Sequence, residues 1–417
     1  MPRERIETVV IGGGQAGLTM SHCLSQRGIA HVVLERHRIA ERWRSERWDS
    51  LRFQFPNWAM RLPDFHYSGD DPDSYAHRDE VVRFIEAYAN HIRAPVRTGV
   101  NVRSLRRDLT SDRFLLDTDM STIEADNVVI ATGPYQKPVI PPAAEGLGGT
   151  FQIAASAYRN PAQLPPGAVL VVGAGASGCQ IAEDLMQAGR RVFLSVGPHR
   201  RVPRRYRGKD IIWWINALGL DDKIADENST RHAPLIISGA NGGRTIDLRA
   251  YAASGMTLLG RVIGARDGSV TFAPDLAANL AAGDESYANF IRNADAFVAQ
   301  SGLELAEEAA PGVRHPEPRS DIGRIDLRAS GIGTVIWATG YHYDFDWIDL
   351  DVFASTDAVS PRIPVHRRGV TQTPGAYFLG LPLLYKTKSS FLSGVGEDAA
   401  YLADHIATRH RADRADT

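Results

Sequence analysis

The stretch Glu7-Thr-Val-Val-Ile-Gly12-Gly-Gly14-Gln-Ala-Gly17 decides the fold, and Val169-Leu-Val-Val-Gly173-Ala-Gly175-Ala-Ser-Gly178 repeats it. In each, a Gly-x-Gly-x-x-Gly turn joins an apolar strand to a helix. The first glycine lets the chain bend sharply, the second lets the backbone approach a pyrophosphate, and the third permits close packing of helix on strand. The free N–H groups at the helix start then face the phosphates. Two such turns predict two dinucleotides in one chain, and the natural pairing is a flavin with a nicotinamide.

The residues that follow each turn indicate which nucleotide it takes. Glu35 ends the second strand of the first unit, 23 residues after Gly12, where an acid typically hydrogen-bonds ribose hydroxyls. The equivalent position after the second turn is Ser195, and losing the acid removes the repulsion that a 2′-phosphate would feel. Arg200 and Arg201 then begin a basic loop, and the fork of an arginine binds two phosphate oxygens at once. We therefore expect FAD at the first turn and favour NADPH over NADH at the second; for any single arginine, a solvated loop or a subunit contact stays open.

An Ala-Thr-Gly follows each turn later in the chain, and these segments complete the two expected cofactor sites. For the flavin we expect contacts from Gly12, Gly14, Gln15, Ala16, Gly17, Glu35, Arg36, Ala131, Thr132 and Gly133. For the nicotinamide nucleotide and its surroundings we expect Gly173, Gly175, Ala176, Ser177, Gly178, Ser195, Arg200, Arg201, Ala338, Thr339 and Gly340.

The length of 417 residues allows two or three domains. Strands at 6–11 and 31–35 around a helix at 15–27 predict a parallel sheet, and helices are expected at 78–91 and about 286–302. The expected fold class is α/β, with two Rossmann-type dinucleotide-binding domains arranged as in glutathione reductase. The NADPH-binding domain (residues 151–328) would be inserted between two parts of the FAD-binding domain (1–150 and 329–417), with Thr334–Gly340 returning the chain to the first domain.

The composition argues against several classes of partner. With 43% hydrophobic and 23% charged residues and a formal net charge of −2, nothing favours nucleic acid or an anionic membrane surface. No stretch is apolar over the eighteen or so residues that a membrane span needs. The N-terminus lacks the apolar segment of a secretory signal, so the cytoplasm is the expected compartment. Histidine spacing suggests no metal site.

The chain has two cysteines, Cys23 and Cys179, each in or beside the helix that follows a glycine turn. No Cys-x-x-Cys is present, which excludes a dithiol–disulfide shuttle within the chain and hence a disulfide reductase of that type. We interpret both thiols as small core residues.

With these motifs in hand, the sequence resembles the flavin-containing monooxygenases over nearly its whole length, in a bacterial branch related to the plant YUCCA-type enzymes. Blocks that carry the resemblance include Glu41-Arg-Trp43-Arg44, Trp48-Asp-Ser-Leu51, Ile130-Ala-Thr-Gly133-Pro and Gly394-Val-Gly-Glu-Asp398. The resemblance implies that NADPH reduces FAD, that a flavin C4a-hydroperoxide forms with oxygen, and that one oxygen passes to a nucleophilic nitrogen or sulfur or to a carbonyl. It places Trp43, Arg44 and Trp48 near the cofactors, with core packing as the alternative for Trp48.

The chain departs from the family fingerprint before the second turn. The family carries Phe, then Gly, then His, then Tyr or Phe; here the stretch is Phe151-Gln-Ile-Ala154-Ala155-Ser156-Ala-Tyr158. The expected His-Ser pair is Ala154-Ala155, which cannot hydrogen-bond within the linker and set the position of the nicotinamide domain. Tyr158, where the Baeyer–Villiger subclass has Trp, favours heteroatom oxidation.

Three further positions complete the expected site. Asn57 of Phe55-Pro56-Asn57 is the predicted catalytic residue, hydrogen-bonding the flavin or bound oxygen, with a turn role as the alternative. Asp398 would lie at a helix end that faces the flavin, or would simply cap that helix. Lys386 and Lys388 would line the substrate pocket and favour an acidic substrate, or belong to a solvated loop.

Three functions remain open on this reading. The first is an FAD- and NADPH-dependent monooxygenase using molecular oxygen and a small-molecule substrate. The second is an NADPH oxidase or uncoupled flavin reductase that releases hydrogen peroxide, which the missing His-Ser pair favours. The third is a flavin-binding regulatory protein, which two intact glycine turns argue against. Because dimers are common among relatives, a homodimer is also open.

Overall fold

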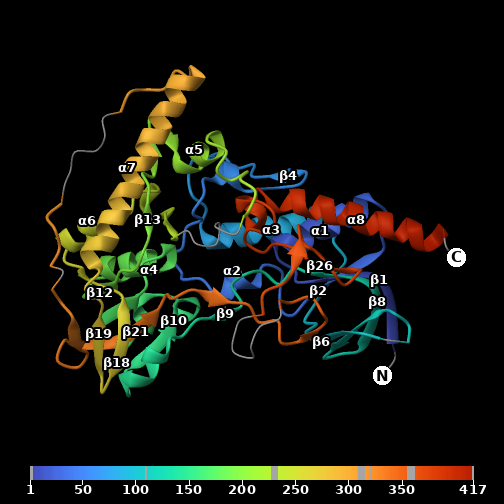
Figure 1. The fold of residues 1–417 in the computed structure, drawn as a ribbon, viewed down its shortest axis with the longest axis horizontal. Helices are drawn as coiled ribbons and strands as arrows, with labels where there is room; N and C mark the ends of the chain where they lie inside the picture. Colours follow the sequence, from blue (N-terminus) through green and yellow to red (C-terminus); the bar gives the residue numbers. More distant parts are fainter. Residues whose placement is uncertain are drawn as a thin grey trace.

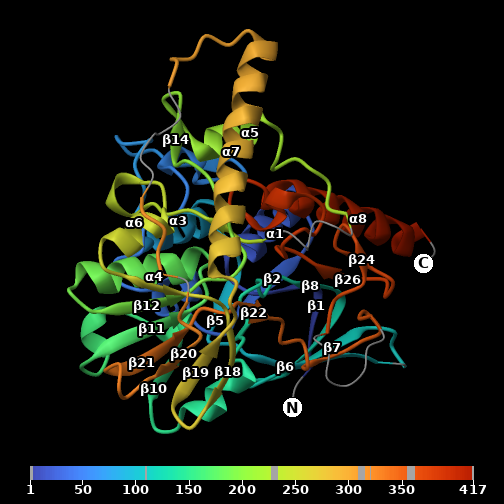
Figure 2. The same ribbon diagram turned by 60° about the vertical axis from the view of Figure 1, so that its left-hand side comes forward.

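Two sheets, each with its own helices, form the two halves of the molecule (Figure 1). The computed structural model describes residues 3–108, 110–226, 233–308, 315–319, 321–354 and 362–415. In Figure 1 the larger sheet lies at the right with both chain ends, and the smaller sheet lies at the left beside the long helix α7. Figure 2 turns the left half forward and shows α4 above the smaller sheet.

The larger sheet has a parallel centre, β5-β2-β1-β8-β26, and an antiparallel extension through β7 and β6. Its strands are β1 (Arg3–Ile11), β2 (His31–Glu35), β5 (Val96–Thr98), β6 (Val102–Arg107), β7 (Phe114–Thr118), β8 (Thr122–Ile130), β23 (Ile348–Asp349), β24 (His366–Arg367), β25 (Val370–Thr371) and β26 (Ala376–Phe378). The helices of this half are α1 (Gln15–Gln26), α2 (Glu41–Ser45), α3 (Arg78–His91) and α8 (Val395–Ala415). The ends of β1 and β8 are buried, as expected for central strands covered on both faces.

The smaller sheet has the order β10-β21-β11-β12-β17 and is parallel throughout. Its strands are β10 (Phe151–Ala154), β11 (Ala168–Val172), β12 (Val192–Ser195), β17 (Thr257–Leu259) and β21 (Ile332–Trp337). The helices of this half are α4 (Ala176–Gln187), α5 (Ile211–Ala217), α6 (Leu248–Ala253) and α7 (Leu276–Ser301). An antiparallel sheet, β18 (Val262–Arg266), β19 (Ser269–Phe272) and β20 (Arg324–Asp326), packs beside it.

Short strands also pair outside these sheets. They are β3 (Arg61–Leu62) with β4 (Phe65–His66), β9 (Lys137–Pro138) with β22 (Tyr341–His342), β13 (Arg200–Arg201) with β16 (Leu235–Ile236), and β14 (Arg205–Tyr206) with β15 (Lys209–Asp210).

The expected fold class is confirmed, with one correction to the domain boundary. Thr334–Gly340 does not return the chain to the first domain, because β21 pairs with both β10 and β11 inside the smaller sheet. The crossing back comes after Gly340, where β22 pairs with β9. The second boundary therefore lies near residue 340 instead of 329.

Helix α3 has the predicted bounds, whereas α7 begins ten residues before the expected 286. Gly283 lies within α7 because a Cβ there would come 2.6 Å from Nε2 of His199, so the helix packs closely on the segment after β12. Among the described residues, no helix combines the length and the apolar character needed to cross a membrane.

Candidate functional site

A cleft of about 1400 Å³ runs between the two halves, and both glycine turns line it. From the larger domain come the first turn, the end of β2, α2 and the segment 131–136 after β8. From the smaller domain come the second turn, residues 197–198 and 234–235, and the segment 337–341. A cleft for one small ligand typically has about 300–1000 Å³. The larger volume, with a glycine turn on each wall, suits two dinucleotides side by side.

The first turn is built by close contacts that only glycine permits. Gly12 has φ +116°, and a Cβ on it would lie 2.5 Å from the carbonyl oxygen of Ala131. A Cβ on Gly17 would lie 1.9 Å from the carbonyl oxygen of Gly12, which is the tight packing of helix on strand expected of the third glycine. The Ala-Thr-Gly after β8 is thus the neighbour that shapes the turn.

The second turn repeats these contacts in the smaller domain. Gly173 has φ +105°, and its Cβ would lie 2.4 Å from the carbonyl oxygen of Ala338. A Cβ on Gly178 would lie 1.8 Å from the carbonyl oxygen of Gly173. Each Ala-Thr-Gly therefore packs against the glycine turn of its own domain. The second one accordingly lies in the smaller domain, after β21.

The space around the middle glycine of each turn, Gly14 and Gly175, shows whether a dinucleotide would fit. A Cβ on Gly14 would meet nothing within 4 Å, and one on Gly175 would meet only Pro234, at 3.9 Å. Neither glycine is needed to relieve a clash within the protein, and both line the cleft at the start of a helix. A glycine that the fold does not require, at the positive end of a helix dipole, fits close approach of a pyrophosphate.

The carboxylate of Glu35 holds the backbone of the first turn by hydrogen bonds. One carboxylate oxygen accepts a hydrogen bond from the Gly13 N–H at 2.7 Å, and the other accepts from the His37 N–H at 2.8 Å. Gln15 begins α1 and donates from Nε2 to the carbonyl oxygen of Ser390 at 2.7 Å, which ties the turn to the segment before α8. Glu35, Gln15, Ala16 and Arg36 all line the cleft.

Aromatic side chains form much of the remaining wall. Trp43 and Trp48 line the cleft, and Trp48 is 5% exposed because it also packs into the core of the smaller domain. Phe55 contacts Phe391 edge to face, with ring centroids 5.2 Å apart. Arg47 lies over the rings of Trp43 and Tyr135, at 5.6 Å from each centroid.

The predicted site residues divide into two groups. Those that the structure brings together along the cleft are Gly12, Gly14, Gln15, Ala16, Glu35, Arg36, Trp43, Trp48, Ala131, Thr132, Gly133, Gly173, Gly175, Ala176, Ser177, Gly178, Ala338, Thr339 and Gly340. Those that lie outside its lining are Gly17, Arg44, Asn57, Ser195, Arg200, Arg201 and Asp398.

Three of the outlying residues are held by partners in the larger domain. Asn57 is 4% exposed and donates from Nδ2 to the carbonyl oxygen of Asp71 at 2.9 Å, so it does not face the cleft as predicted. Arg44 forms an ion pair with Glu86. Asp398 is in the first turn of α8, and its carboxylate pairs with Arg368 at 3.0 Å. Asn57 and Asp398 therefore have contacts within the protein and lie outside the cleft lining, while the buried Oδ1 of Asn57 has no hydrogen-bond partner.

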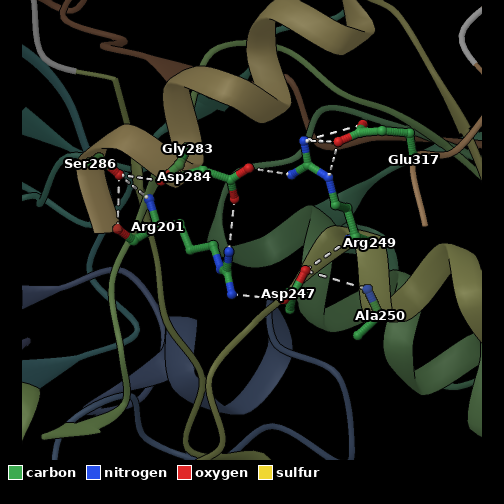
Figure 3. Close-up of polar contacts among 8 residues, drawn as sticks. All are labelled: Arg201, Asp247, Arg249, Ala250, Gly283, Asp284, Ser286 and Glu317. Carbon is green, nitrogen blue, oxygen red and sulfur yellow. Dashed lines mark hydrogen bonds and ion pairs between the residues drawn. The ribbon is translucent and has the colours of Figure 1, made fainter. Parts of the chain in front are cut away.

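The predicted binding of a 2′-phosphate near Ser195 and by Arg201 also needs correction. The Ser195 hydroxyl is buried; it donates to the carbonyl oxygen of Gly260 at 2.9 Å and accepts from the Val262 N–H. Arg201 pairs with Asp247 at 2.7 Å and Asp284 at 2.8 Å, and Figure 3 shows its guanidinium held between these carboxylates. Two carboxylates already pair with the Nη atoms of this arginine, and its buried Nε has no hydrogen-bond partner, so its charge is not free for a phosphate.

The rest of the basic loop is also engaged. Arg204 pairs with Asp210 and Arg207 with Asp295, each within hydrogen-bonding distance. Arg200 and Arg205 differ, because both are exposed and neither has a carboxylate partner among the ion pairs of the described residues. Arg200 donates from Nε to the carbonyl oxygen of Ala233, and Arg205 donates to the Gly242 carbonyl oxygen and the Tyr75 hydroxyl. A count of arginines in the sequence therefore overstates the positive charge that a cofactor would meet.

Other predicted residues lie away from the cleft. Lys386 and Lys388 both pair with Asp222 and Glu397, which gives a four-residue ionic cluster between the domains and no lining for a substrate pocket. Cys23 and Cys179 are buried, and burial raises their thiol pKa values to about 11 and about 12, so both stay protonated and unreactive near neutral pH.

Sequence reasoning missed several cleft residues. Gln136 donates from Nε2 to the Thr132 hydroxyl and the Gly133 carbonyl oxygen, which fixes the first Ala-Thr-Gly. Gln54 and Phe391 also line the cleft. A signal existed for Gln136, which directly follows a cofactor motif. None existed for Phe391, because it reaches the cleft from a loop far along the chain.

Comparison with known proteins now decides the family. The model described as "Pyridine nucleotide-disulphide oxidoreductase" matches residues 9–217. A CzcO-like uncharacterised oxidoreductase of Geobacillus kaustophilus is 33% identical over 408 residues, covering 96% of this chain and 98% of its own length. The chain belongs to the pyridine nucleotide-disulphide oxidoreductase family. It is therefore an NAD(P)H-dependent oxidoreductase, and the family binds a flavin and a nicotinamide cofactor.

Two further similarities are to proteins that carry monooxygenase names. The probable indole-3-pyruvate monooxygenase YUCCA1 of Arabidopsis thaliana is 33% identical over 192 residues, which cover 45% of this chain and 46% of that protein. The flavin-containing monooxygenase of Stenotrophomonas maltophilia has the same fold, with a TM-score of 0.65 at 17% identity over 97% of this chain and 99% of its own.

Proposed function

We propose that this family member is an FAD- and NADPH-dependent monooxygenase that transfers one oxygen atom from molecular oxygen to a small nucleophilic nitrogen or sulfur compound or to a carbonyl compound. The observation that carries the proposal is that two glycine turns, each with its own Ala-Thr-Gly, open into one cleft. Two dinucleotides bound there would meet within that cleft and would not need separate sites.

The chain's own residues would bind, orient and shield. The Gly12–Gly17 turn and the start of α1 would hold the pyrophosphate of FAD, and Glu35 would lie beside its ribose. The Gly173–Gly178 turn and the start of α4 would hold the nicotinamide nucleotide. A bound flavin supplies hydride acceptance and oxygen activation, which no side chain of the cleft provides. Trp43, Trp48 and Phe55 would exclude water from the space between the cofactors.

The preference for NADPH rests on two residues. Ser195 carries no charge where an acid would repel a 2′-phosphate, although its hydroxyl is used within the fold. Arg200 is exposed and has no carboxylate partner among the described ion pairs, and its guanidinium is suited to a phosphate. Arg205 is exposed and unpaired with a carboxylate as well, but the Tyr75 hydroxyl and two backbone carbonyls hold it. The proposal therefore assigns the 2′-phosphate to Arg200 and not to Arg201.

The alternative is an NADPH oxidase that releases hydrogen peroxide. It is favoured by Ala155, which lines the cleft in the fingerprint segment and offers no polar side chain there. An NADPH oxidase would use the same cofactor residues, and the two functions differ in where the oxygen goes.

The test is turnover of the FAD-loaded protein with NADPH and dioxygen labelled with a heavy oxygen isotope. A sulfide, a tertiary amine, a ketone and an aromatic 2-oxo acid serve as substrates; the last is included because the YUCCA1 relative is named an indole-3-pyruvate monooxygenase. Labelled product, with a matching fall in hydrogen peroxide, supports the monooxygenase. Peroxide equal to the NADPH consumed, with every substrate, supports the oxidase. No NADPH oxidation contradicts both.

A further inference from the structure

Arg204 lies in the basic loop but reaches across to the other domain. Its side chain is 2% exposed, and it pairs with Asp210 of its own domain at 2.9 Å. Its Nη1 donates to the carbonyl oxygen of Gln54, in the FAD-binding domain, at 2.7 Å. The guanidinium also lies over the ring of Tyr75, another residue of that domain, at 4.4 Å from the centroid.

Tyr75 completes this contact from the other side. Its hydroxyl donates to the Asp210 carboxylate at 2.6 Å and accepts from Nε of Arg204 at 3.0 Å. Glycines of the smaller domain make room for it: a Cβ on Gly243 would lie 2.3 Å from the Tyr75 ring, and one on Gly239 would lie 2.0 Å from the carbonyl oxygen of Phe53. We call Arg204, Asp210, Tyr75 and the Gln54 carbonyl the interdomain joint.

The joint is adjacent to the cleft wall. Phe53, Gln54 and Phe55 line the cleft from the FAD-binding side, and Arg204 holds the middle of this segment by its backbone. Burying a charged pair costs desolvation free energy, so a buried pair is weak evidence for added stability. Its directional hydrogen bonds do fix the relative position of the groups that they connect.

We propose that Arg204 is a positioning residue: it sets the distance and orientation between the wall at 53–55 and the nicotinamide-binding domain, and so aligns the nicotinamide with the flavin. In this chain the fingerprint positions 154 and 155 are alanines, and the joint supplies a buried polar link between the domains beside the cleft wall. The inference rests on the proposed function only in that a hydride passes from the nicotinamide, which is oxidised, to the flavin, which is reduced.

The joint has a matched control in the same loop. Arg207 pairs with Asp295 at 2.8 Å and lies over the Tyr206 ring, so its partners belong to the smaller domain alone. Lysine keeps the charge but loses the planar fork. R204K and R207K are therefore the same chemical change, one across the domain boundary and one within a domain.

The first readout needs no cofactor. Amide hydrogen exchange of the apoprotein should increase in peptides spanning residues 51–57 and 238–243 for R204K, and R207K should leave both peptides as in the wild type. The second readout is the limiting rate of anaerobic reduction of the bound flavin by NADPH. Because misplacement of reacting groups by about 1 Å costs up to about a hundredfold in rate, we expect R204K to lose about tenfold or more, with FAD content unchanged.

Y75F provides a second variant, since it removes the joint's hydroxyl and leaves the ring. It should show the same increase in exchange with a smaller loss of rate. If R204K and Y75F match R207K in exchange and in reduction rate, the proposal is overturned, and Arg204 is structural only. If R204K does not fold, Y75F decides by the same two readouts. If the wild-type flavin is not reduced by NADPH, the proposed function fails, and the exchange comparison still tests the joint.

Discussion

The two glycine turns have nearly the same geometry, yet the residues around them differ. In both, the first glycine abuts the alanine carbonyl of its own Ala-Thr-Gly, at 2.5 Å for Gly12 and 2.4 Å for Gly173. After the first turn, Glu35 accepts two backbone N–H groups and faces the cleft. After the second, Ser195 points into the fold. The close contacts of the glycine pattern are thus the same in both domains, whereas the residue that follows, to which we assign the choice of nucleotide, differs in type and in placement.

The strongest way to break this comparison is to fill the tight contacts. G17A and G178A each place a Cβ within 1.9 Å of a backbone carbonyl oxygen that cannot move away cheaply. We expect each variant to lose on the order of 3 kcal/mol of unfolding free energy, as overpacking does. Calorimetry of the apoproteins measures the loss. Wild-type melting temperatures would contradict the assigned role of the third glycine.

The middle glycines separate cofactor contact from folding. G14A and G175A introduce a Cβ into free space, so the apoproteins should keep their wild-type melting temperatures. With cofactor, G14A should weaken FAD binding by roughly tenfold or more, and G175A should weaken NADPH binding similarly while leaving FAD bound. Fluorescence titration gives both affinities. If either alanine leaves its dinucleotide affinity unchanged, that turn does not hold a pyrophosphate.

A smaller effect should distinguish the arginines beyond the second turn. R200A should reduce the preference for NADPH over NADH by roughly three- to tenfold, because it removes a phosphate ligand. R201A removes a partner of Asp247 and Asp284, so it should lower thermal stability and leave the preference intact. Steady-state kinetics with both coenzymes measures the preference. The opposite pattern would restore Arg201 as the phosphate ligand.

The smallest expected effect concerns an acid that, unlike Glu35, is buried. Asp221 is 6% exposed, and burial raises the pKa of its carboxyl to about 6, although Lys388 lies nearby. A raised folded-state pKa means that the native state binds the proton more tightly, so this group costs stability as pH rises from about 4 through 6. D221N should therefore raise the melting temperature by a few degrees at pH 8 and have little effect near pH 4. D222N is the control, since Asp222 is paired with both lysines and should be destabilising when changed.

The sequence was sufficient for those parts of the fold and site that depend on local pattern. The two turns, α3 and the Ala-Thr-Gly segments follow from glycine spacing and apolar periodicity, and the structure has them at or near the predicted bounds. The sequence could not predict to which domain Thr334–Gly340 belongs, because an apolar strand has the same residue pattern in either sheet. It is settled only by pairing of β21 with β10 and β11.

Side-chain roles were harder to predict for a related reason. Arg201 and Asn57 have the residue types that a cofactor site needs, but their partners come from distant segments: Asp247 and Asp284 for the arginine, and the Asp71 carbonyl for the amide. The sequence shows that a charged side chain is present, but only the tertiary contacts show whether an opposite charge already pairs with it. Tertiary contacts also show that Arg204 holds the other domain, although its basic loop was predicted from the sequence to bind a phosphate.

The measurement that tests the central claim most directly is an anaerobic titration of the FAD-loaded protein with NADPH, followed by the visible absorbance of the flavin. If both dinucleotides meet in the one cleft, stoichiometric NADPH should bleach the bound flavin, and G175A should abolish bleaching without releasing FAD. Bleaching that survives in G175A, or a wild-type flavin that NADPH leaves oxidised, would contradict the account.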